Sequence, residues 1–155
     1  MINYFNDDIL ASKDSLFIHG CNSKGKFASG IAGLFRKKFP YSYNAYNAKY
    51  IKDGLTLGSI IWATPPDMDL NAGPIIGNCI TQENYGYDKR CYVSYDAIGR
   101  CFEEALLFAH EIQVNSITMP QIGAGLGGGD WNRIEEILIN SNKLFPYIDI
   151  NVYWI

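Results

Sequence analysis

Short apolar runs alternate along the chain with longer segments in which apolar residues recur every three or four positions. Runs of the first kind are typical of β-strands, and segments of the second kind are typical of amphipathic helices. We expect strands at residues 2–5, 15–19, 58–64, 75–81, 116–119 and 150–155. The strongest helical pattern begins after Ser94, a good N-cap, and continues to about His110.

Three further helices are expected, at residues 30–39, at 43–50 and after Asp130, which can cap the last of them. Pro40 follows the first of these helices and is expected to mark its end. Strands that alternate with helices predict an α/β fold, in which helices cover both faces of a sheet.

Composition narrows the class of protein. A chain of 155 residues with 48% hydrophobic residues is the size of one domain with a substantial core, so we expect a single domain over residues 1–155. A net charge of -3 argues against a general nucleic-acid-coating protein. No secretory signal or membrane span is evident, and the four cysteines and two histidines lack zinc-site spacing. We expect a cytosolic monomer with no membrane association, no cofactor and no metal.

Two glycine-bearing loops each follow a predicted strand and enter a predicted helix, at residues 20–30 and 121–129. Ligands of α/β proteins bind beyond the carboxyl ends of strands. Glycines let the backbone approach a bulky anion, and the helix behind each loop adds a favourable dipole. Two such loops suit a diphosphate, although the glycines could also merely relieve turns. Neither loop has the Gly-Lys-Ser/Thr of a Walker loop, and Gly123-x-Gly125 lies too late in the chain for the usual dinucleotide fingerprint.

The motifs of these loops resemble those of the macrodomain family of ADP-ribose binders. The carriers of the resemblance are Asp8-Ile9, His19-Gly20-Cys21-Asn22, Gly25, Ser29-Gly30-Ile31-Ala32, Met119-Pro120-Gln121-Ile122-Gly123-Ala124-Gly125-Leu126 and Trp131. The His-x-Cys-Asn and Met-Pro-Gln-Ile forms are similar to the branch that contains the fungal ADP-ribose 1''-phosphate phosphatase and the terminal ADP-ribose glycohydrolases. The resemblance covers nearly the whole chain, and it implies a three-layer α/β/α sandwich around a mixed sheet of about six strands.

The resemblance also implies a set of ADP-ribose-binding residues: Asp8, Ile9, Cys21, Asn22, Ser29, Gly30, Ile31, Gln121, Ile122, Gly123, Ala124, Gly125, Leu126, Gly127 and Ile155. Asp8 would accept a hydrogen bond from the exocyclic amine of adenine, because a carboxylate only accepts; a turn or helix cap is the alternative. Asn22 would hold hydroxyls of the distal ribose, or form an ordinary Asx-turn. Ile155 would flank the adenosine end, or simply pack a strand.

The catalytic assignment depends on two positions. In the glycohydrolase branch a lysine attacks the anomeric carbon and a carboxylate assists, but Gln82 and Gly127 occupy those positions here. Glutamine cannot form a Schiff base, and glycine cannot take a proton. We therefore expect hydrolysis of ADP-ribose 1''-phosphate, with the terminal phosphate beside Asn22 and His19 and with His19 as acid or base. The alternative for His19 is a buried core residue.

Two other functions remain open at this point. A glycohydrolase could remove ADP-ribose from protein or nucleic acid by using Asp130 or His19, although Asp130 also suits a helix N-cap. A non-catalytic ADP-ribose reader is the other alternative. Cys21 should share a strand face with His19 as a reactive pair or as packing. A lysine cluster is either a solvated face or a source of positive potential near an anionic ligand or a nucleic-acid end, and it comprises Lys24, Lys26, Lys37 and Lys38. Three tyrosines either form a lid over the distal ribose or fill a surface groove, and they are Tyr85, Tyr87 and Tyr92.

Overall fold

Six strands and four α-helices follow one another along the chain in the computed structural model, which describes residues 1–88 and 90–154. The strands are β1 (Ile2–Phe5), β2 (Leu16–Asn22), β3 (Ile60–Ala63), β4 (Ile75–Gln82), β5 (Ser116–Pro120) and β6 (Asp149–Tyr153). The helices are α1 (Gly30–Lys38), α2 (Pro40–Asp53), α3 (Tyr95–Glu111) and α4 (Trp131–Asn142). Two short 3-10 helices, η1 (Ile9–Ala11) and η2 (Pro66–Met68), complete the set.

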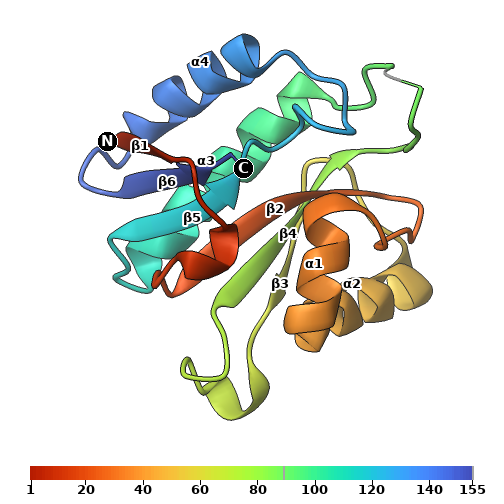
Figure 1. Cartoon of the computed structure of the whole chain (residues 1–155), viewed down its shortest axis with the longest axis horizontal. Helices are drawn as coiled ribbons and strands as arrows, with labels where there is room; N and C mark the ends of the chain where they lie inside the picture. The colour runs from red at the N-terminus through yellow and green to blue at the C-terminus, as the bar shows by residue number, and fades with distance from the viewer. Residues whose placement is uncertain (89, 155) are drawn as a thin grey trace.

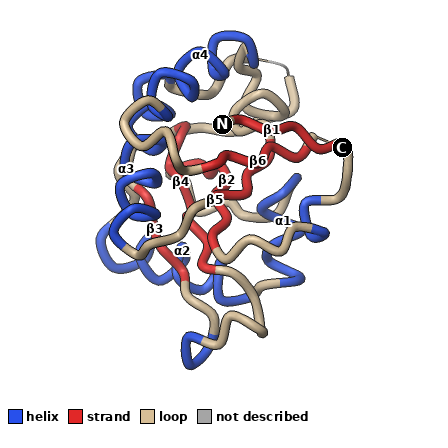
Figure 2. Tube along the Cα trace, turned by 90° about the vertical axis from the view of Figure 1, so that its left-hand side faces the viewer, coloured by secondary structure: helices blue, strands red, loops and turns tan. Residues whose placement is uncertain are grey.

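The strands form one mixed sheet in the order β1-β6-β5-β2-β4-β3, in which only the β3–β4 pair is antiparallel. Helices α1 and α2 cover one face of the sheet, and α3 and α4 cover the other (Figure 1). Figure 2 shows the sheet between these two helical layers. The predicted three-layer α/β/α sandwich is confirmed.

Strands β2 and β4 are neighbours inside the sheet and are almost completely buried. Every residue of β4 except its last is buried, as expected for a strand covered on both faces. Above this strand, α3 begins where the Ser94 side chain accepts a hydrogen bond from the Ala97 N–H at 3.1 Å. The predicted cap of the longest helix is therefore confirmed. Its buried stripe is Ala97, Ile98, Cys101, Phe102, Ala105, Leu106 and Ala109.

The largest differences from the predicted bounds are in α2 and β2, and the other predicted bounds differ by at most two residues. Pro40 is the first residue of α2 and not merely the end of the preceding helix, because proline needs no N–H partner in the first turn. Strand β2 continues three residues beyond His19, since it keeps pairing with β4, and its register shifts between Cys21 and Asn22. This longer strand carries Cys21 and Asn22 to the carboxyl edge of the sheet.

Candidate functional site

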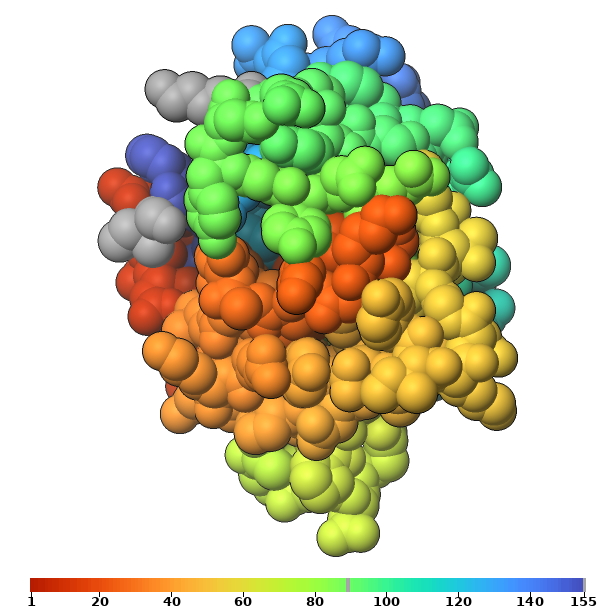
Figure 3. All heavy atoms as spheres, turned by 90° about the vertical axis from the view of Figure 1, so that its right-hand side faces the viewer, coloured from red at the N-terminus to blue at the C-terminus, as the bar shows by residue number. Residues whose placement is uncertain are grey.

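A cleft of about 600 Å³ opens at the carboxyl edge of the sheet, a typical size for a small-molecule site. Figure 3 shows it as a hollow between the segment that follows β2 and the segment that follows β4. The cleft is lined by Gly20, Cys21, Asn22, Lys26, Ala28, Ser29, Gly30, Ile31, Ala32, Thr81, Gln82, Tyr85, Gly86, Tyr87, Pro120, Gln121, Ile122, Gly123, Gly125, Leu126 and Gly127. The two predicted glycine-bearing loops therefore face one cavity. We call the lining of residues 22–32 the first wall and that of residues 121–127 the second wall.

The second wall presents backbone amides that the protein itself does not use. Within the described residues, the N–H groups of 123 and 125–127 donate to no other protein group. The next two N–H groups do bond within the same loop. Gly129 N–H donates to the Gly123 carbonyl at 2.8 Å, and Gly128 N–H donates to the Gly125 carbonyl at 3.1 Å. Gly123 has φ 81°, a conformation that glycine adopts readily. A Cβ placed on Gly125 would meet nothing within 4 Å. Such a nest of N–H groups can bind an anion.

The first wall combines a helix N-terminus with a polar turn. Helix α1 begins at Gly30, and the N–H groups of 30–32 have no acceptor in the described part of the chain. The Ser29 side chain makes no cap bond to the helix and contacts the Tyr87 hydroxyl across the mouth of the cleft. Because the first N–H groups of a helix favour negative charge, the first wall also suits an anion.

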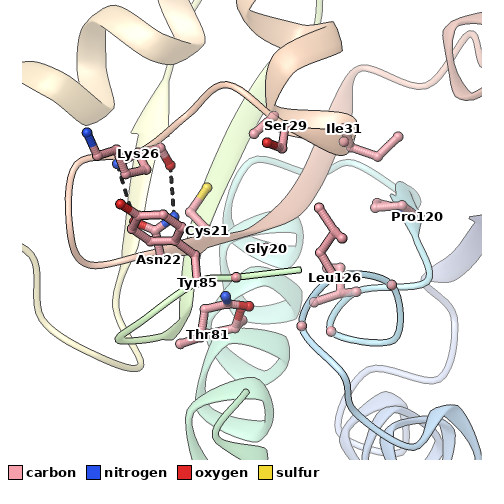
Figure 4. Close-up of a pocket in the computed structure, with 18 of the residues that line it drawn as sticks. Gly20, Cys21, Asn22, Lys26, Ser29, Ile31, Thr81, Tyr85, Pro120 and Leu126 are labelled. Atoms are coloured by element: carbon pink, nitrogen blue, oxygen red, sulfur yellow. Dashed lines mark hydrogen bonds between the residues drawn. The ribbon is translucent and has the colours of Figure 1, made fainter. Parts of the chain in front are cut away.

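Asn22 organises the turn of the first wall. Its Oδ1 accepts hydrogen bonds from the Lys24 N–H at 3.0 Å and from the Lys26 N–H at 3.3 Å, and its Nδ2 donates to the Lys26 carbonyl at 2.9 Å. The Tyr46 hydroxyl also donates to Oδ1, at 3.2 Å. Figure 4 shows Asn22 joined to Lys26 at one end of the cleft. Asn22 therefore forms the Asx-turn that was the alternative to ribose binding. One of its two Nδ2 hydrogens remains for a ligand.

His19 lies beneath the site and does not line the cleft. Its side chain is fully buried, and its Nε2 lies 2.5 Å from Asn78 Oδ1. It packs edge-on against Phe27 and Phe35. Burial lowers the pKa of His19 to about 4, so the imidazole is neutral near pH 7. The buried ring matches the core alternative for His19, since it is absent from the cleft lining, and the acid or base role stays a prediction that this position does not favour.

Cys21 lies between His19 and the cleft. Its Sγ is 3.9 Å from His19 Nδ1 and 3.7 Å from Nε2, which confirms that the two side chains share a face. Burial raises the pKa of the Cys21 thiol well above its ordinary value, so it stays protonated. The pair packs the cleft floor and has no thiolate nucleophile.

Several residues expected at the site lie elsewhere. Asp8 is exposed outside the cleft lining, and its Oδ1 caps η1 by accepting the Leu10 N–H at 2.9 Å. Ile9 is buried in the core under α1. Asp130 caps α4 by accepting the Asn132 N–H at 3.0 Å and does not line the cleft. Ala124 is also absent from the lining, and Ile155 lies outside the described residues.

Capping explains these corrections. A short acidic side chain before a helix turn finds backbone N–H groups within its own segment, and those groups are closer than any distant pocket. Asp8 and Asp130 therefore form the caps that the sequence offered as alternatives, while their roles toward a ligand stay predictions.

Sequence reasoning missed other parts of the lining. Gly20, Ala28, Ala32, Thr81 and Pro120 join the cleft because the ends of β2, β4 and β5 converge there. Gly20, Ala32 and Pro120 stand inside the recognised motifs and Ala28 directly precedes one, so the motifs themselves could have identified these four. Thr81 carries no such signal.

Thr81 is the most informative of the missed residues. It is 1% exposed, and its hydroxyl has no hydrogen-bond partner in the described part of the chain. A Cβ on Gly20 would approach this hydroxyl to 3.0 Å. The floor between the two walls thus contains an unsatisfied polar group, which costs folding free energy.

A segment between β4 and α3 covers the cleft. Tyr85 and Tyr87 line it, whereas Tyr92 does not and instead bonds Asp88 Oδ1 at 2.6 Å. The segment is tied to the second wall, because the Tyr92 N–H donates to the Gly127 carbonyl at 2.7 Å. With the Ser29–Tyr87 contact, this segment bridges both walls. Two of the three tyrosines thus form part of the cleft boundary.

Gln82 and Gly127 lie together in the cleft lining. A Cβ on Gly127 would lie 2.6 Å from Val93 Cγ1, 2.8 Å from the Gly123 carbonyl oxygen and 3.1 Å from Gln82 Oε1. There is consequently no room for a carboxylate side chain at position 127. Lys26 is the only charged residue among those described in the lining.

Among the described residues, no group of three or more His, Cys, Asp or Glu side chains is arranged to hold a metal ion. None of the helices within 1–88 and 90–154 is both long enough and apolar enough to cross a membrane.

Comparison with known proteins places the chain in a family. Residues 18–138 match the family model described as "Macro domain". An ADP-ribose 1''-phosphate phosphatase of Candida albicans is 29% identical over 168 residues, which cover 99% of each chain. A DNA ADP-ribosyl glycohydrolase of Mycobacterium tuberculosis is 25% identical over 155 residues, and the match covers 99% of this chain but only 42% of that protein. The chain thus spans less than half the length of that relative.

A solved structure agrees with these sequence matches. The macrodomain of Mycobacterium tuberculosis DarG superposes with a TM-score of 0.84 at 25% identity, over 99% of this chain and 97% of that one. The family model covers more than half of the chain, and the fold and both loop motifs agree with it. This chain belongs to the Macro domain family.

Proposed function

We propose that this domain binds ADP-ribose, with the diphosphate held between the first and second walls. The observation that carries the proposal is the pair of facing walls with N–H groups that no described protein group accepts. A diphosphate can accept several hydrogen bonds at once, and its charge is favoured by the N-terminus of α1. The named relatives, an ADP-ribose 1''-phosphate phosphatase and a DNA ADP-ribosyl glycohydrolase, support the same ligand.

The chemistry of the lining orients the ligand in this proposal. Asn22, Lys26 and Tyr85 gather at one end of the cleft, and Ile31 and Leu126 lie at the other (Figure 4). The polar end suits the distal ribose, whose hydroxyls need donors and acceptors. The more apolar end suits the adenosine. Asp8 then has no place in the walls, and a role in adenine selection would need contacts outside the lining.

We further propose that the domain hydrolyses ADP-ribose 1''-phosphate to ADP-ribose and phosphate. The terminal phosphate of this substrate would lie at the polar end, near the Lys26 ammonium. A water adds to phosphorus, the bond from phosphorus to the sugar oxygen breaks, and a water proton ends on that oxygen. No carboxylate or imidazole lies in the described lining, so the phosphate itself would accept the proton first. The walls supply positioning and charge stabilisation.

The covalent glycohydrolase route finds less support. Gln82 is no nucleophile for the anomeric carbon, and the packing around Gly127 excludes a carboxylate. The site therefore favours attack by water on a terminal phosphate over attack by a lysine on the sugar.

Two assays test the proposal on the purified chain. Calorimetry with ADP-ribose is expected to show saturable binding, and phosphate release from ADP-ribose 1''-phosphate is expected to follow enzyme concentration. Release of ADP-ribose from modified DNA, without phosphate release, would favour the glycohydrolase. Tight binding with neither product would leave a reader, and no binding would reject the assignment.

A further inference from the structure

Charge is distributed very unevenly along this acidic chain. Residues 15–52 contain no aspartate or glutamate, although the whole chain has 16. The same segment contains seven of the 13 lysines and arginines: Lys24, Lys26, Arg36, Lys37, Lys38, Lys49 and Lys52. The rest of the chain therefore has six cations against all 16 carboxylates. A net charge of -3 conceals a basic segment within an acidic protein.

The fold turns this segment into one continuous surface. It contains the first wall and the α1–α2 layer, the orange and gold atoms that lie directly beneath the hollow in Figure 3. All seven cationic side chains belong to exposed residues. Among the described residues, only Lys49 of these seven forms an ion pair, with Asp53 at 2.9 Å. We call this surface the basic face.

The basic face reaches the polar end of the cleft. Tyr50, near the end of α2, lies against the turn of the first wall, because a Cβ on Gly25 would come within 2.5 Å of its ring. The end of α2, with Lys52, is therefore next to the turn that contains Lys24 and Lys26. Tyr50 itself is 38% exposed. Lys26 in the cleft lining, Lys24 in the same turn and the Tyr50 ring against that turn thus lie near the end of the cleft where the distal ribose is proposed to lie, and Lys52 follows two residues later on α2.

We propose that the basic face docks a single-stranded nucleic acid that passes the polar end of the cleft. Lysines act as point charges for successive phosphates, and an exposed tyrosine offers a surface on which a base can stack. The acidic remainder of the surface repels a long polyanion, so the strand is confined to this face. An anionic membrane fits less well, since Ile51 is the only large aliphatic side chain exposed on the described α2 surface.

An acidic peptide could use the lysines but gains little from the tyrosine. This difference separates the two kinds of partner experimentally. The inference rests on charge placement, and it adds a macromolecular partner to the ADP-ribose site proposed above without depending on hydrolysis.

The test uses the full chain and a fluorescein-labelled single-stranded DNA of mixed sequence, about 15 nucleotides long. Fluorescence anisotropy is expected to show that the logarithm of the association constant falls linearly with the logarithm of salt concentration. The slope should be about -2 for three phosphate contacts. The double variant Lys24→Gln/Lys52→Gln should weaken binding roughly tenfold and bring the slope to about -0.7. The matched control Lys13→Gln/Lys143→Gln removes two exposed lysines from other surfaces and should change neither value.

Tyr50→Ala adds a readout that charge alone would not move. It should weaken DNA binding roughly tenfold and leave the salt slope unchanged, because stacking releases no counterions. Polyglutamate and vesicles of anionic phospholipid serve as competing probes. If either binds better than the DNA through Lys24 and Lys52, or if the lysine variants bind DNA like the control, the proposal is overturned.

ADP-ribose calorimetry on the same variants separates the two proposals. Lys24→Gln/Lys52→Gln should keep ADP-ribose binding, because neither side chain lines the cleft. Gly125→Val should lose ADP-ribose binding and keep DNA binding. A chain that binds DNA in this manner but not ADP-ribose would refute the proposed function and retain the basic face.

Discussion

The two walls of the cleft present similar backbone amides but are built in opposite ways. The first wall is held by side chains: Asn22 binds two amides and a carbonyl of its own turn, and Tyr46 supports it from beneath. The second wall depends on missing side chains, with glycines at 123, 125 and 127 and bonds only between backbone groups. One wall should therefore fail when a polar group is removed, and the other when a side chain is added.

The largest expected effect is on ADP-ribose binding, and it comes from a substitution that disrupts the second wall alone. Gly125→Val should weaken ADP-ribose binding at least about a hundredfold, or ~3 kcal/mol, because the new side chain enters the space proposed for the diphosphate. The fold should persist, since a Cβ at this position meets nothing within 4 Å.

Calorimetry measures the loss, and thermal unfolding checks the fold. Gly99→Ala, where a Cβ would make an ordinary 3.4 Å contact with Ile137, is the matched control outside the cleft. Unchanged binding by a folded Gly125→Val variant would show that the ligand lies elsewhere.

The second effect is on the pH dependence of stability, and it comes from His19 beneath the first wall. His19 has a folded pKa of about 4, below the ordinary 6.5, so the unfolded chain binds the proton more tightly. Its contribution to stability is complete above about pH 6.5 and is lost as pH falls toward 4, by about 3 kcal/mol in all.

Urea unfolding between pH 7.5 and pH 4 measures this loss. His19→Gln should flatten the dependence, whereas His110→Gln, at an exposed histidine, should keep it. Equal slopes in the wild type and His19→Gln would contradict the neutral buried imidazole.

The third effect dismantles the turn of the first wall. Asn22→Ala removes the acceptor of the Lys24 and Lys26 amides and should lower the free energy of unfolding by about 2 kcal/mol, with weaker ADP-ribose binding. Asn22→Asp keeps that acceptor and loses only the donor to the Lys26 carbonyl. Its free energy of unfolding should therefore lie between those of the wild type and Asn22→Ala. Chemical denaturation ranks the three proteins, and an Asp variant no better than Ala would show that the acceptor is unimportant.

The smallest effect concerns the floor between the walls. Thr81→Val replaces an unpartnered buried hydroxyl with a methyl group of similar shape and should raise the free energy of unfolding by about 1 kcal/mol. Thr118→Val provides the contrast, because the Thr118 hydroxyl donates to Asp14 Oδ2 at 2.7 Å and its loss should destabilise the protein. Destabilisation by both substitutions would mean that the Thr81 hydroxyl has a partner in solution.

The sequence predicted well what depends on local pattern. Apolar periodicity located the strands and α3, and the caps at Ser94 and Asp130 follow from side chains that bond within four residues. The two loops were predicted to serve one diphosphate because ligands of α/β proteins bind beyond the carboxyl ends of strands, and both loops do line one cleft.

What depends on side-chain direction could not be predicted. His19 and Cys21 share a strand face, yet only Cys21 reaches the cleft, because Phe27 and Phe35 enclose the imidazole. Asn22 has the chemistry to hold a ribose, but its own turn offers nearer partners. Thr81 carried no motif, and only the convergence of three strand ends places it in the floor.

An NMR titration of the 15N-labelled chain with ADP-ribose tests the central claim most directly. Amide resonances of Gly125, Leu126 and Gly127 in the second wall, and of Ile31 and Ala32 in the first, should shift together and saturate at one ligand concentration. Shifts confined to one wall, or saturable shifts elsewhere with both walls unchanged, would contradict a diphosphate held between them.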